Sequence, residues 1–134
     1  MKKIVIDGNR FDDEESFYNE IDRLLTRNLT WKTGHNLDAF NDLLCGGFGF
    51  HEYCEELIIV WVNALKSKTD LGYEETVRHW ERILLNCHPS NIEYVQKKIQ
   101  DARNQTGETL FDIIIHIITD SDESGHDCKL ELAD

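Results

Sequence analysis

The segment Glu56–Val62 constrains the fold of this chain more than any other. After its glutamate it reads Leu-Ile-Ile-Val-Trp-Val, with no polar residue at alternate positions. A solvated antiparallel strand alternates apolar and polar residues, whereas a central strand covered on both faces is apolar throughout. We therefore expect residues 57–62 to form the central strand of a sheet that lies between helices.

Two further segments have the composition of strands. Lys3-Ile4-Val5-Ile6 ends at the turn residues Asp7-Gly8-Asn9, and residues 110–118 are apolar for much of their length. Apolar residues at helical spacing predict helices over residues 13–25, 36–45, 73–86 and 90–102, and a short helix to about Lys68. Strands that alternate with helices imply right-handed crossovers. The pattern predicts a three-layer α/β fold with a small three-stranded parallel sheet packed with helices.

The length of 134 residues fits one domain. We expect residues 1–118 to form this domain and residues 119–134 to form an acidic C-terminal tail. The tail has six acidic residues and one lysine, with little apolar surface. It is either disordered or adds an edge strand at Lys129–Leu132.

The charge of the chain limits its possible partners. Twenty-six acidic and fourteen basic residues give a net charge of -12, which repels phosphate backbones and anionic membranes and attracts cationic proteins. No apolar run is long enough to span a membrane, and residues 1–7 have no signal-peptide core. We therefore expect a cytoplasmic protein that binds neither nucleic acid nor membrane, with reduced cysteines and with Cys45 and Cys87 buried.

The segment Gly34–Asp42 is the most informative about function. Asp38 and Asp42 are four residues apart, so both lie on one face of the predicted helix. Leu37, Phe40 and Leu44 lie on the opposite face. Like charges at this spacing destabilise an isolated helix slightly, and a cationic partner would offset that cost.

At these residues the chain resembles the barstar family of ribonuclease inhibitors. The family's helix-entry motif is present as Gly34, Asn36, Leu37, Asp38, Ala39 and Asp42, and the order of elements matches over residues 1–118. The resemblance implies an inhibitor, with no catalytic residues, cofactor or metal, whose second helix and preceding loop fill the active-site cleft of a cationic ribonuclease. The implied partner-binding residues are Trp31, Lys32, Gly34, Asn36, Asp38, Asn41, Asp42 and, by element order, Asp101 on the late helix.

The chain departs from the family pattern beside the motif. Trp31, Lys32 and Thr33 stand where tyrosines are usual, and Asn41 stands where a tryptophan is common. Extra segments occur at residues 46–50, 73–86 and in the tail. These departures leave the identity of the target nuclease open.

Parts of the sequence are compatible with three other functions. A zinc site could draw on His51, Cys54, Cys87, His88 and Cys128, but their spacings fit no familiar zinc pattern. A hydrolase could draw on His35, Asp38, Asp42 and His116, but carboxylates on adjacent turns of an exposed helix lack an enclosing pocket. An immunity or adaptor protein that binds a different cationic toxin, not a ribonuclease, remains the alternative.

Overall fold

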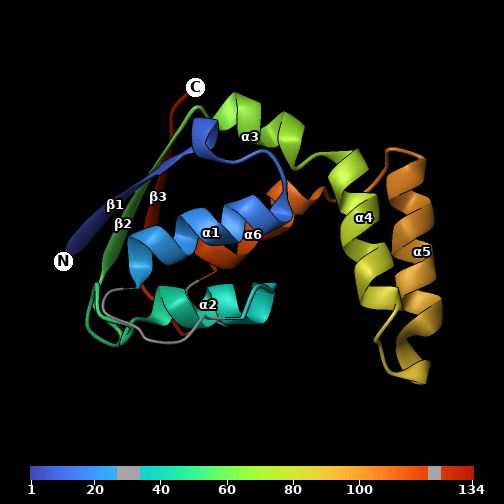
Figure 1. The fold of residues 1–134 in the computed structure, drawn as a ribbon, viewed down its shortest axis with the longest axis horizontal. Helices are drawn as coiled ribbons and strands as arrows, with labels where there is room; N and C mark the ends of the chain where they lie inside the picture. The colour runs from blue at the N-terminus through green and yellow to red at the C-terminus, as the bar shows by residue number, and fades with distance from the viewer. Residues whose placement is uncertain (27–33, 121–124) are drawn as a thin grey trace.

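The computed structural model describes residues 1–26, 34–120 and 125–134. Its sheet has three parallel strands, β1 (Lys2–Asp7), β2 (Leu57–Val62) and β3 (Cys128–Leu132), in the order β1-β2-β3. The register places Ile4 beside Ile59 and Ile59 beside Leu130. The small parallel sheet with β2 at its centre is therefore confirmed (Figure 1).

The prediction of a strand over residues 110–118 is wrong, because these residues form helix α6 (Leu110–Thr119). Thr109 and Asp112 make a capping box, in which each side chain accepts a hydrogen bond from the other residue's backbone N–H. A continuous apolar run does not distinguish a buried helix from a strand, and the cap decides for helix. The third strand is β3, which lies in the predicted acidic tail. An edge strand at Lys129–Leu132 was one of the two alternatives for that tail.

The other predicted helices are present in the structure. The sheet strands are linked by α1 (Glu14–Leu25), α2 (Leu37–Cys45), α3 (Ala64–Asp70), α4 (Tyr73–Leu84), α5 (Ile92–Arg103) and α6, with short 3-10 turns at Gly8–Arg10 and Pro89–Asn91. Among the described residues, no helix is long and apolar enough to cross a membrane.

The helices α1, α2 and α6 lie on one side of the sheet (Figure 1). Along β2, buried residues alternate with half-buried ones, so that Ile58, Val60 and Val62 point to a less covered face. The prediction of three layers with β2 covered on both faces is therefore wrong. Trp61, on the covered face, is fully buried; its ring stacks on Phe17 and meets Phe111 edge to face.

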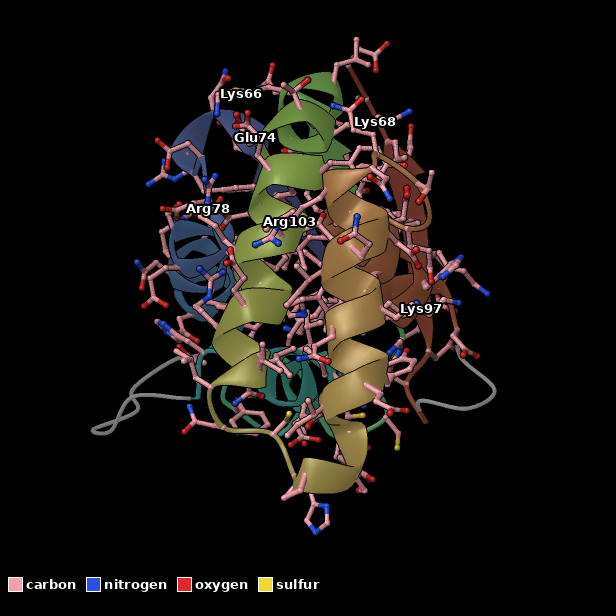
Figure 2. The ribbon with its side chains drawn as sticks, turned by 90° about the vertical axis from the view of Figure 1, so that its right-hand side faces the viewer. Lys66, Lys68, Glu74, Arg78, Lys97 and Arg103 are labelled. Carbon is pink, nitrogen blue, oxygen red and sulfur yellow. The ribbon has the colours of Figure 1, made fainter. Side chains whose placement is uncertain are left out.

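The helices α4 and α5 form an antiparallel hairpin that projects from the rest of the molecule (Figures 1 and 2). Val95, Ile99 and Ala102 are the buried residues of α5. The hairpin is attached through α4: the buried Thr76 hydroxyl accepts a hydrogen bond of 2.7 Å from the backbone N–H of Leu110, at the start of α6. This attachment fixes α4 against the start of α6.

Candidate protein-binding site

Helix α2 is fixed at both of its ends. The Asn36 side chain accepts a hydrogen bond of 2.7 Å from the backbone N–H of Ala39, which is the N-cap arrangement. Gly46 ends the helix with a φ of +96°, and a Cβ atom there would clash with the carbonyl oxygen of Glu52. Phe40 and Leu44 are buried as predicted, so the opposite face of α2 is presented from a rigid support.

The exposed face of α2 carries two carboxylates that form no ion pair with the residues described by the structure. Asp38 and Asp42 are both exposed, and neither makes an ion pair or hydrogen bond with any residue that the structure describes. The helix dipole favours Asp38 in the first turn but disfavours Asp42 near the C-terminal end. The face therefore holds unneutralised negative charge at a cost of a few tenths of a kcal/mol.

The remaining candidate residues occupy different surroundings. Gly34 is exposed and Asn41 is half-buried on α2, whereas Trp31 and Lys32 lie outside the described residues. Asp101 lies on α5, which α4 separates from α2 (Figure 1). Asp101 was assigned to the interface by the order of elements, with α5 taken as the helix directly before a strand at residues 110–118. Those residues form helix α6 instead. The structure therefore does not bring Asp101 to the face that bears Asp38 and Asp42.

The residue between Gly34 and Asn36 anchors the motif to α1. His35 lies between two carboxylates, with Nδ1 2.5 Å from Glu15 Oε1 and Nε2 2.8 Å from Asp22 Oδ2. Partial burial lowers the pKa of His35, but the two carboxylates outweigh it and hold the pKa above its usual value. No local pattern indicates this contact, because the partners lie 13 and 20 residues away.

A buried polar network joins α1 to α4 next to the motif. The carboxylate of Glu14 accepts hydrogen bonds from the Tyr18 hydroxyl at 2.6 Å, from His79 Nδ1 at 3.0 Å and from Arg82 at 2.5 Å. Burial raises the pKa of Glu14, but these bonds prevail and hold the pKa at about 2. The carboxylate of Glu75 accepts the backbone N–H of Glu14 at 2.7 Å. The network fixes α4 against α1.

A cleft of about 790 Å³ lies between the start of α2 and α4. Its walls come from the motif, from the first turns of α1 and from α4, and its lining includes Asn36, Asp38, His79, Trp80, Ile83 and Asn86. The sequence predicted α4 as an amphipathic helix and gave it no role in binding a partner. Trp80 lines this cleft and is half-buried there.

The residues considered for metal binding and hydrolysis are dispersed. Across residues 1–26, 34–120 and 125–134, no group of three His, Cys, Asp or Glu side chains is placed to hold a metal. His116 is exposed on α6 and contacts Glu108 at 2.7 Å, away from Asp38 and Asp42. The four cysteines are free.

The expectation that Cys45 and Cys87 are buried is wrong, because both are half-buried near the ends of helices. Cys128, at the start of β3, is the buried cysteine. Burial raises its pKa to about 12, so this thiol stays protonated at neutral pH.

The fold and the α2 face define a small α/β protein with a preformed acidic surface. A family model described as Barstar (barnase inhibitor) matches residues 1–133, and the chain belongs to this family. The match includes β3. No curated protein and no solved structure matched the chain.

Proposed function

We propose that this protein inhibits a cationic ribonuclease by covering the active-site cleft of the enzyme with α2 and the segment before it. The observation that carries the proposal is the pair Asp38 and Asp42, which are exposed on a rigid helix and form no ion pair within residues 1–26, 34–120 and 125–134. The family, described as barnase inhibitors, supports the same function.

The chemistry of such a contact follows from the substrate of the enzyme. A ribonuclease binds the phosphates of RNA in a cationic pocket, and carboxylates on a fixed helix can occupy that pocket in place of phosphates. The charge of -12 would speed the encounter, by about 10- to 10³-fold at low salt. Barnase with barstar, the namesake complex of the family, is itself one of the pairs on which this general range is based.

The candidate residues contribute to the proposed contact in different ways. Asp38 and Asp42 supply the charge, and Asn36 holds the first turn of α2 in place. Gly34, Asn41, Trp31 and Lys32 belong to the same contact area. For Asp101 to contact the same partner, the partner would have to reach across α4, and Asp101→Asn tests this separately.

The test is RNA cleavage by a barnase-type ribonuclease, titrated with this protein. We expect stoichiometric inhibition, and we expect Asp38→Ala and Asp42→Ala each to weaken the complex by about 2–5 kcal/mol, because each leaves a cationic pocket buried and unpaired. Glu74→Ala is the matched control, since it removes one exposed acid from the first turn of α4, outside the lining of the cleft (Figure 2).

Two results would contradict the proposal in different ways. If both aspartate variants bind as the parent does, the α2 face is not the contact surface. If the parent fails to inhibit, the target is not a ribonuclease of this type. A pull-down that returns a cationic toxin without ribonuclease activity would then identify an immunity or adaptor role.

A further inference from the structure

We infer that the cleft between α2 and α4 binds an arginine side chain of the partner, so that the α4–α5 hairpin forms a second wall of the interface. The inference rests on the proposed function, because a cationic protein is the occupant that the acidic face selects. It adds a defined pocket and residues of α4 to a contact otherwise confined to α2 and the segment before it.

The wall of the cleft includes a buried polar atom without a partner. His79 Nδ1 lies 3.0 Å from both oxygens of Glu14, and a carboxylate only accepts, so Nδ1 carries a proton. The other ring nitrogen, Nε2, is buried and has no hydrogen-bond partner among the described residues, although His79 lines the cleft. An unsatisfied buried nitrogen at this wall favours a ligand that brings a polar group over a wholly apolar one.

The charged side chains that line the cleft favour a cationic ligand. Arg82 also lines the cleft, but its guanidinium is bound to Glu14 at 2.5 Å and lies 3.6 Å from Glu75. Glu15 is engaged by His35. Asp38 is the lining carboxylate without an ion pair among the described residues, and its negative charge selects a cation.

The cleft also has an apolar side. Trp80 and Ile83 of α4 supply it, and the Trp80 ring is held by edge-to-face contacts with His79 and Tyr94. The aliphatic stem of arginine can pack on such a surface, and its planar guanidinium stacks on indole better than an ammonium group does. The combination of an aromatic ring and an unpaired carboxylate therefore favours arginine.

The distribution of charge along the chain agrees with a role for the hairpin as a wall. Residues 64–108 contain seven basic and seven acidic residues, so the rest of the chain carries the whole net charge of -12. On the outer side of the hairpin, Arg78 pairs with Glu75 and Arg103 with Glu81 (Figure 2). The hairpin therefore adds shape and apolar surface beside α2 without repelling a cationic partner.

The direct test uses Nα-acetyl-arginine amide as the probe, titrated into the parent and followed by NMR. We expect saturable shifts of the Trp80 indole and the His79 ring, and none with the uncharged isostere Nα-acetyl-citrulline amide. Asn86 is exposed at the cleft, so we expect Asn86→Asp to bind the probe about threefold more tightly and Asn86→Lys about threefold more weakly.

The matched controls are Asn104→Asp and Asn104→Lys. Asn104 is also an exposed asparagine at a helix end, but it follows α5 and lies outside the cleft lining. Both Asn104 variants should bind the probe as the parent does. Equal shifts with arginine and citrulline, or an Asn86→Lys protein that binds like the parent, would overturn the inference.

The ribonuclease titration separates this inference from the proposed function. We expect Asn86→Lys to weaken inhibition at least about tenfold while Asn104→Lys stays within about twofold of the parent. If Asp42→Ala abolishes inhibition but Asn86→Lys does not weaken it, the proposed function stands and the cleft inference fails. If the parent does not inhibit but the arginine probe binds as expected, the ribonuclease assignment fails and the cleft inference stands.

Discussion

Glu14 and His79 are in direct contact although 65 residues separate them, with His79 Nδ1 3.0 Å from both carboxylate oxygens of Glu14. The contact joins the first turn of α1 to the middle of α4, and it lies beneath the cleft beside α2. The position of α4 relative to the acidic helix therefore depends on a buried carboxylate that stays ionised.

Glu14→Gln should destabilise the protein by about 2 kcal/mol at pH 7, because the charged acceptor of three hydrogen bonds is lost. The folded pKa of about 2 lies below the ordinary value of 4.5, so the contribution is present above pH 4.5 and is lost as the pH falls toward 2. Urea unfolding of both proteins between pH 7 and pH 2 measures this. A stability difference that did not shrink toward pH 2 would contradict the assignment.

His35 should stabilise the protein most at mildly acidic pH. Its pKa is raised in the folded state, so its contribution is fully present below the ordinary value of 6.5 and is lost as the pH rises through the raised value. Comparing the unfolding free energies of the parent and of His35→Gln at pH 5.5 and pH 9 measures the effect. The His35→Gln protein should show the smaller decline between these values, and equal declines would rule out the contacts with Glu15 and Asp22.

His126 should have the opposite effect to His35 on the pH dependence of stability. It is buried just before β3, and burial lowers its pKa below the ordinary value of 6.5. Its contribution to stability is therefore present above pH 6.5 and declines as the pH falls, because the folded state resists protonation. Thermal unfolding between pH 7.5 and pH 5 should show a smaller loss for His126→Gln than for the parent. The His35→Gln protein serves as a comparison, since its change has the other sign.

Removal of residues 120–134 should prevent stable folding. The deletion takes away β3 and the two hydrogen bonds of Ala133, which accepts from Ala64 at 2.9 Å and donates to Trp61 at 2.8 Å. One edge of β2 would then be left unpaired. Circular dichroism and limited proteolysis of the truncated chain provide the measurement. A truncated chain as stable as the parent would show instead that residues 1–119 form a domain by themselves.

The sequence predicted α2 and the face that it exposes. Asn36 is a strong N-cap residue, Gly46 ends the helix, and the spacing of Asp38 and Asp42 requires a common face in any helix. These properties depend on residues within one or two turns, so local chemistry suffices to predict them. The motif also pointed to the family that the match over residues 1–133 confirms.

Two features of the fold were wrongly assigned from the sequence. Residues 110–118 have a continuous apolar run that suits a strand or a buried helix equally, and the capping box at Thr109 decided between them. The apolar run of β2 suggested cover on both faces, yet the described helices α1, α2 and α6 lie on one side of the sheet (Figure 1). Neither outcome follows from periodicity, because it depends on which segments pack together.

The cleft was decided by tertiary structure alone. Asp38 and Trp80 lie in segments that no local pattern relates, and they face one cleft because Glu14 holds α4 and Thr76 attaches it to α6. Hydrophobic periodicity records which face of each element is apolar, and it determined helices α1 to α5, strands β1 and β2 and the acidic face of α2. Which buried polar groups pair depends on contacts between residues far apart in the chain, and these contacts exist only once the chain has folded.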